Sequence, residues 1–128
     1  MKRKSFIITS NQTSFVLRNV IRFKRCKICK MRFTPDNITG VQSILLNIDG
    51  ISTNTFLNSS GNYIQYFFMV PFVNNNFASS YSNDLTDTWD YNSSIEKAIN
   101  SLIITVTNES GVPITMNNSN LIIELLFE

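Results

Sequence analysis

The two cysteines of the chain, Cys26 and Cys29, form the one motif whose spacing is typical of redox or metal chemistry. In redox proteins a Cys-x-x-Cys motif sits at a helix start, where backbone amides lower the pKa of the thiol. Here it lies within Phe23–Phe33, whose residue pattern is that of a strand. Zinc needs further ligands, and the chain has no second cysteine pair and no histidine. We therefore interpret both cysteines as structural thiols in a reducing compartment, and we expect no metal and no cofactor.

Three aspartates spaced by three residues, Asp84, Asp87 and Asp90, are the candidates for paired-carboxylate catalysis or for a calcium loop. Their spacing is not the alternating pattern of an EF-hand, so a solvated acidic loop is the simpler interpretation. The chain also lacks histidine, the residue most used for acid–base catalysis near neutral pH. We expect no enzymatic activity. A hydrolase that depends on Asp84 or Asp87 is the alternative.

Three aromatic residues near these aspartates, Tyr81, Trp89 and Tyr91, allow a second kind of site. Exposed beside Asn and Asp side chains, they would form a sugar-stacking surface of the lectin type. Alternatively, Trp89 and Tyr91 pack the surrounding loop against the domain and bury apolar area. We favour this packing role, and we expect the loop with Asp84, Asp87, Trp89, Asp90 and Tyr91 to be exposed and to face a partner.

The charges are separated along the chain. Residues 1–32 carry ten of the eleven basic residues, and residues 33–128 carry Lys97 and all nine acidic residues, so that +10 and −8 sum to +2. Such separation concerns partners and association rather than fold. It predicts a cationic surface that contacts a neighbouring subunit or, nonspecifically, nucleic acid; the alternative is a merely solvated arm and edge strand. The basic residues are Lys2, Arg3, Lys4, Arg18, Arg22, Lys24, Arg25, Lys27, Lys30 and Arg32.

Short runs of β-branched and aromatic residues, separated by turn residues, predict about eight strands. The one helix candidate is Ser94–Asn100, which has serines for an N-cap and a glutamate in the first turn. This pattern is typical of an all-β fold, an antiparallel β-sandwich or barrel. The predicted strands are Phe6–Thr9, Ser14–Phe23, Cys26–Phe33, Val41–Ile48, Ser52–Leu57, Tyr63–Val70, Leu102–Thr107 and Leu121–Phe127.

A chain of 128 residues has room for one domain. We divide it into a basic N-terminal arm, residues 1–13, and a single domain, residues 14–128, with a long loop at 72–93. No apolar run approaches the roughly 20 residues of a membrane span. The apolar stretch after Lys4 is too short for a secretory signal, so we expect no export.

The final third resembles the closing strands of single jelly-roll capsid proteins of the polinton-like virus, virophage and adintovirus group. The resemblance rests on the segment Ser94–Met116, which contains the alternating strand Leu102–Thr107 and the turn Asn108-Glu109-Ser110-Gly111-Val112-Pro113-Ile114, and on the apolar strand Leu121–Phe127. The middle segments Val41–Asp49 and Tyr63–Pro71 are similar to middle strands of that family. The resemblance implies a single jelly roll.

The resemblance further implies a structural capsid protein of an icosahedral double-stranded DNA virus, located in the virion and assembled inside the host cell. A single jelly roll of this size is most similar to the penton protein, a homopentamer at each vertex. Its partners would be other copies of itself, the major capsid protein and, nonspecifically, packaged DNA. Two alternatives remain open, namely a minor or cement capsid protein and a lectin-like receptor-binding head that uses Trp89.

Overall fold

The computed structural model describes residues 1–36, 38, 40–84 and 86–128. All regular elements in these residues are β-strands, as predicted, and none of the described segments is a helix that could cross a membrane. The strands are β1 (Lys2–Ile8), β2 (Gln12–Thr34), β3 (Leu45–Ile48), β4 (Asn54–Leu57), β5 (Tyr63–Tyr66), β6 (Phe68–Met69), β7 (Phe72–Val73), β8 (Asn76–Phe77), β9 (Ser80–Ser82), β10 (Tyr91–Thr107) and β11 (Asn120–Phe127).

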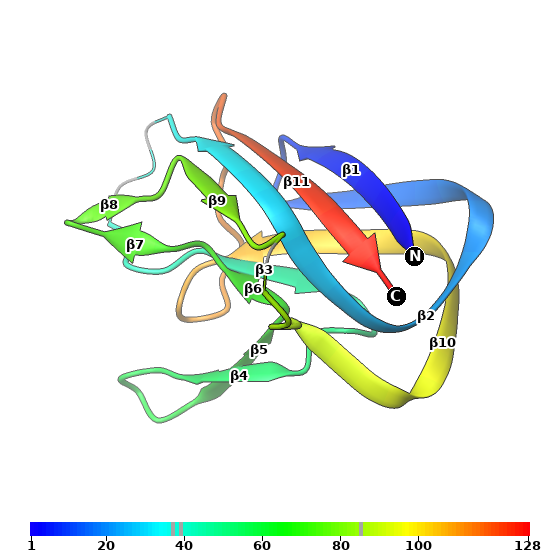
Figure 1. Cartoon of the computed structure of the whole chain (residues 1–128). Helices are drawn as coiled ribbons and strands as arrows, with labels where there is room; N and C mark the ends of the chain where they lie inside the picture. Colours follow the sequence, from blue (N-terminus) through cyan, green and yellow to red (C-terminus); the bar gives the residue numbers. More distant parts are fainter. Residues whose placement is uncertain (37, 39, 85) are drawn as a thin grey trace.

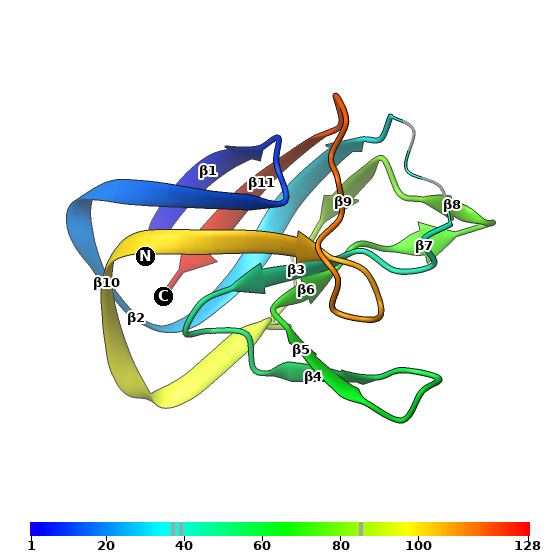
Figure 2. The same cartoon turned by 180° about the vertical axis from the view of Figure 1, so that it is seen from behind.

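The main strands form two layers that enclose the core (Figures 1 and 2). The front layer has the order β1-β11-β2-β9 and uses residues 26–34 of β2. The back layer has the order β2-β10-β3-β6 and uses residues 12–23 of β2. Every pairing is antiparallel, so the predicted antiparallel sandwich is confirmed.

The strands pair as they would in one long hairpin that is rolled up into a sandwich. The first segment pairs with the last, β1 with β11, and the first half of β2 pairs with β10. The second half of β2 pairs with β9, and β3 pairs with β6. Rolling then adds β11 beside β2 and β10 beside β3. This double-layered arrangement of eight segments is that of a jelly roll.

Two long strands, β2 and β10, pass from one layer to the other without an intervening loop (Figure 1). The sequence predicts separate strands at Ser14–Phe23 and Cys26–Phe33; both are present, but they are continuous. Irregular register accompanies the bend, because bulges let a strand turn sharply while its neighbours stay paired. The register shifts lie between Asn92 and Lys97 and between Ile99 and Ser101.

The predicted helix at Ser94–Asn100 is wrong, because these residues belong to β10. Ala98 and Ile99 pair with Arg22 and Ile21 of β2. A seven-residue helix would leave most of its backbone groups without internal partners and is marginal in water. Pairing with a long neighbouring strand satisfies those groups instead.

The predicted loop at 72–93 is largely structured, although residue 85 lies outside the described residues. A small hairpin of β7 and β8 turns at Asn74 and Asn75, whose φ angles of 53° and 63° lie in the left-handed region that asparagine tolerates. β9 then pairs with β2, and Tyr91 is already the first residue of β10. The sequence pattern misses these pieces because each is only two or three residues long.

The basic start of the chain is part of the front layer. β1 begins at Lys2, before the predicted strand Phe6–Thr9, and pairs with β11 along its whole length. Apolar alternation reveals only Phe6 and Ile8, the two residues of β1 that are buried. Lys2, Arg3 and Lys4 therefore lie in an edge strand instead of preceding the first strand.

Candidate functional site

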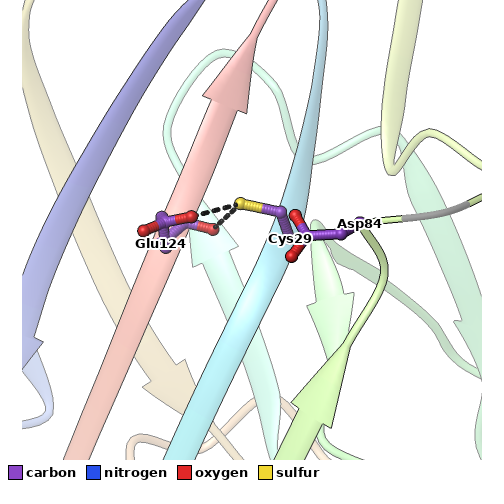
Figure 3. A group of neighbouring side chains, drawn as sticks. All are labelled: Cys29, Asp84 and Glu124. Carbon is purple, nitrogen blue, oxygen red and sulfur yellow. Dashed lines mark hydrogen bonds between the residues drawn. The ribbon is translucent and has the colours of Figure 1, made fainter.

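Four charged or ionisable side chains from distant parts of the chain meet on the front layer, and we call them the Arg3 cluster: Arg3, Cys29, Asp84 and Glu124. Arg3 lies in β1. Figure 3 shows the other three residues: Cys29 lies in β2, Glu124 lies in β11, and Asp84 follows β9. Ligand atoms of Cys29, Asp84 and Glu124 lie within 4.8 Å of one another. Antiparallel pairing of β1, β11, β2 and β9 is what brings them together.

The guanidinium of Arg3 occupies the space among the other three groups. Its Nη1 lies 3.0 Å from Asp84, 2.9 Å from Glu124 and 3.5 Å from Sγ of Cys29. The Cys29 thiol also donates to Oε1 of Glu124 at 3.0 Å. A metal ion at this position would have to displace Arg3, so the cluster is best described as an ion-pair network.

The two thiols are poor nucleophiles in this environment. Burial, the hydrogen bond to Glu124 and its negative charge raise the pKa of Cys29 to about 11. Burial raises the pKa of Cys26 well above its ordinary value. Both cysteines are free and buried, in agreement with their interpretation as structural thiols. A thiolate is the reactive form, and neither site favours it near neutral pH.

Cys29 reaches the cluster because of a β-bulge in β2, which the spacing of residues in the sequence does not reveal. On β11, Glu124 pairs with Lys30 and the next residue, Leu125, pairs with Ile28, so Cys29 is the extra residue of a bulge. As a result, four consecutive residues of β2, from Cys26 to Cys29, are buried. Strict alternation would have placed every second one of them on the outside.

A second group of side chains, the Trp89 cluster, consists of Arg25, Lys27, Trp89 and Asp90. The guanidinium carbon of Arg25 lies 4.4 Å and Nζ of Lys27 lies 5.0 Å from the centre of the Trp89 ring. Lys27 is buried and donates to the carbonyl of Thr86 at 2.7 Å. These contacts fasten the segment before β10 to β2, as the favoured packing role of Trp89 predicts.

The loop residues that we expect to be exposed divide into two kinds. Asp84 and Asp87 are exposed, whereas Trp89 and Asp90 are half-buried and Tyr91 is buried against Phe23. Burial raises the pKa of Asp90 to about 6, while a hydrogen bond from the Ile28 amide and the charge of Lys27 act in the opposite direction. The predicted exposure is therefore wrong for Trp89, Asp90 and Tyr91. Tyr91 belongs to β10, which begins earlier than predicted, whereas Trp89 and Asp90 contact β2.

Charge separation along the sequence becomes charge pairing in space. Arg3 and Lys30 pair with Asp84, at 3.0 and 3.9 Å, and Arg3 also pairs with Glu124. Arg22 pairs with Glu96 at 3.6 Å, and Arg25 pairs with Glu128. The remaining exposed basic residues of the predicted surface have no ion pair among the described residues; they are Lys2, Lys4, Arg18, Lys24 and Arg32. Contact of these residues with DNA or a neighbouring subunit stays a prediction.

A groove of about 480 Å³ lies on the outer side of the front layer, beside the Arg3 cluster. Four strands contribute to its lining: β1, β11, β2 and β9. Its charged side chains are Lys30, Arg32 and Glu124, and its hydroxyl groups are those of Ser5, Ser80 and Ser82. The sequence does not reveal this groove, because its residues come from segments up to 119 positions apart, from Ser5 to Glu124.

The chain was compared with protein-family models, with curated proteins and with solved structures, and no match was found in any of the three.

Proposed function

We propose that the chain is a structural capsid protein of an icosahedral double-stranded DNA virus and that it forms homopentamers at the vertices. The jelly roll is the observation that carries this proposal, since viral capsid domains are among the proteins built on it. Among the functions of jelly-roll proteins, the resemblance of the closing strands to single jelly-roll capsid proteins favours that of a capsid protein.

The back face of the sandwich offers an exposed patch for a ring contact. In a closed ring each subunit applies one patch to a different patch of its neighbour. The back face exposes Ser14, Val16 and Ser101, with 89 % of Val16 accessible. An exposed valine between serines suits one side of such a contact, and it leaves the charged groove of the front face open.

The distribution of the exposed basic residues supports an orientation in which one end of the sandwich faces the interior of the capsid. The bends of β2 and β10 and both termini lie near one another, while the β7–β8 hairpin lies at the opposite end (Figures 1 and 2). The amides of Lys24 and Arg25 donate to the Glu128 carbonyl, and Lys2 pairs with Phe127. Residues 33–96 contain no Lys or Arg. A cationic bend end suits nonspecific contact with packaged DNA or with an acidic patch of the major capsid protein.

Native mass spectrometry of the purified chain tests the proposal. We expect a pentamer for the wild type, a monomer for Val16→Asp and an unchanged pentamer for Leu57→Asp. Leu57 is the matched control because it is also an exposed apolar residue, 56 % accessible, but lies on the β4–β5 hairpin, whose strands pair with neither layer. A wild-type monomer at all concentrations would overturn the pentamer and favour a cement protein. A trimer would favour the receptor-binding head.

A further inference from the structure

The outer groove of the front layer brings two basic side chains beside two hydroxyl groups. In the register of β2 and β9, Lys30 is opposite Ser82 and Arg32 is opposite Ser80. Directly opposite residues on one face of an antiparallel pair have their Cβ atoms about 5 Å apart. Each basic residue therefore has a hydroxyl neighbour, and the two pairs lie one after the other along the strands. This arrangement can hold an oxyanion and a second polar group of the same ligand.

The Arg32 end of the groove is the stronger anion position. Arg32 is exposed and has no ion pair among the described residues, whereas Lys30 lies 3.9 Å from Asp84 and opposite Glu124. The negative charge of Glu124 stays in place because the hydrogen bonds from Cys29 and Arg3 lower the pKa of its carboxyl group. An anion is thus attracted most strongly to Arg32 and less to Lys30.

The other residues that line the groove indicate which class of ligand would carry the anionic group. Ser5 adds a third hydroxyl group, and Ile122 offers an apolar floor, with 38 % of its surface exposed. The aromatic ring nearest the groove, that of Tyr81, packs inward against Phe68 at 5.1 Å, so it does not offer a face for stacking a base. Hydroxyl groups, positive charge and a small apolar floor match a saccharide better than a nucleotide.

We propose that this groove binds an acidic sugar, a saccharide that carries a sulfate or carboxylate group. Arg32 and Ser80 hold the oxyanion, Lys30 and Ser82 hold adjacent ring substituents, and the C–H face of the sugar rests on Ile122. This site is distinct from the Trp89 surface of the lectin alternative, and it does not depend on the oligomeric state.

Amide-detected NMR titration tests the groove with three probes: a sulfated heparin disaccharide, sialic acid and neutral N-acetylglucosamine. We expect the first two to shift the amides of residues 30–32 and 80–82 and the neutral sugar to shift none of them. Because both acidic probes carry a carboxylate, binding of sialic acid would show that a carboxylate suffices, whereas binding of the disaccharide alone would favour sulfate. Absence of shifts with both acidic sugars would overturn the proposal, whatever the outcome for the pentamer.

Two variants separate the groove from general electrostatic attraction. Arg32→Gln should weaken binding about tenfold, the loss expected for one charge-assisted contact. Arg18→Gln should leave binding unchanged, since Arg18 lies outside the groove and is likewise an exposed basic residue with no ion pair in the described part of the chain. Equal weakening by both variants would contradict a specific site. Binding of an acidic peptide but of neither acidic sugar would replace the proposal by a protein-docking surface.

Discussion

The Arg3 cluster and the Trp89 cluster draw their β2 residues from the same five positions, 25–29, yet the pKa of the carboxyl group shifts in opposite directions in the two clusters. In the Arg3 cluster, hydrogen bonds from Cys29 and Arg3 lower the pKa of Glu124. In the Trp89 cluster, burial raises the pKa of Asp90 to about 6 despite a nearby lysine. The comparison teaches that burial, more than the presence of a neighbouring basic residue, decides the direction in which the pKa of a carboxyl group shifts.

The largest effect should follow the loss of the buried basic residue. Lys27→Ala removes the hydrogen bond to Thr86, the contact with Trp89 and the positive charge near Asp90. We expect a loss of about 3–5 kcal/mol in the free energy of unfolding, the range for breaking a buried charge interaction. Urea denaturation measures it. Lys24→Ala, an exposed neighbour on the same strand, is the control and should change stability little.

The second prediction concerns pH. The pKa of Asp90, about 6 when folded and 3.8 ordinarily, means that the folded state binds a proton more tightly. Stability should therefore rise as pH falls from 8 to 5, by about 1.4 kcal/mol, because pH 5 lies about one unit below the folded pKa and still above the ordinary one. Asp90→Asn should remove this dependence, and Asp87→Asn, at an exposed position, should keep it. A wild-type stability that is flat between pH 5 and pH 8 would contradict the buried state of Asp90.

The third prediction concerns thiol reactivity in the Arg3 cluster. A Cys29 pKa of about 11 against an ordinary 9.0 lowers the thiolate fraction at pH 8 about a hundredfold. In the folded protein we expect neither cysteine to react with Ellman's reagent on the timescale of a free thiol, and both to react in urea. Glu124→Gln should speed the reaction of Cys29, because it removes the negative charge that disfavours the thiolate. Rapid reaction of Cys29 in the folded wild type would contradict this prediction, because it would show that the reagent reaches the thiol.

The smallest effect should come from the ion pairs of the Arg3 cluster. Glu124→Gln should cost at most about 1 kcal/mol, since its carboxylate and Arg3 are both accessible to water and screened. The contribution should shrink further in high salt, and it should be lost as pH falls below the ordinary range of glutamate, because a lowered pKa stabilises only the ionised form. If Glu124→Gln lowered the free energy of unfolding by an amount that does not depend on salt, the prediction would be wrong. Glu124 would then be shielded from solvent, as Asp90 is in the Trp89 cluster.

The fold class could be predicted because apolar alternation survives wherever a strand faces the core. On β11, Leu121, Ile123 and Leu125 are all buried, as their period of two indicates. The helix at Ser94–Asn100 could not be rejected from local propensity, since β2 supplies the pairing partner from elsewhere in the chain. Tertiary pairing also explains the early start of β1.

The sites could be predicted less well, because they arise from register. The bulge at Cys29 and the groove across four strands depend on which residues are opposite each other. Sequence order reveals a basic segment and an acidic remainder, but it does not reveal that Arg3 lies beside Asp84. The packing role of Trp89 could be favoured from the sequence, since a large aromatic ring buries much apolar area, but its partners Arg25 and Lys27 could not be identified, because they lie on a distant strand.

The position of β11 has a consequence for biogenesis. This strand, formed by Asn120–Phe127, lies in the interior of the front layer between β1 and β2. On a translating ribosome the front layer therefore has an empty slot until residues 120–127 have left the exit tunnel. β1 and β2 emerge first with unpaired edges, so the front layer should complete its folding only after β11 has emerged.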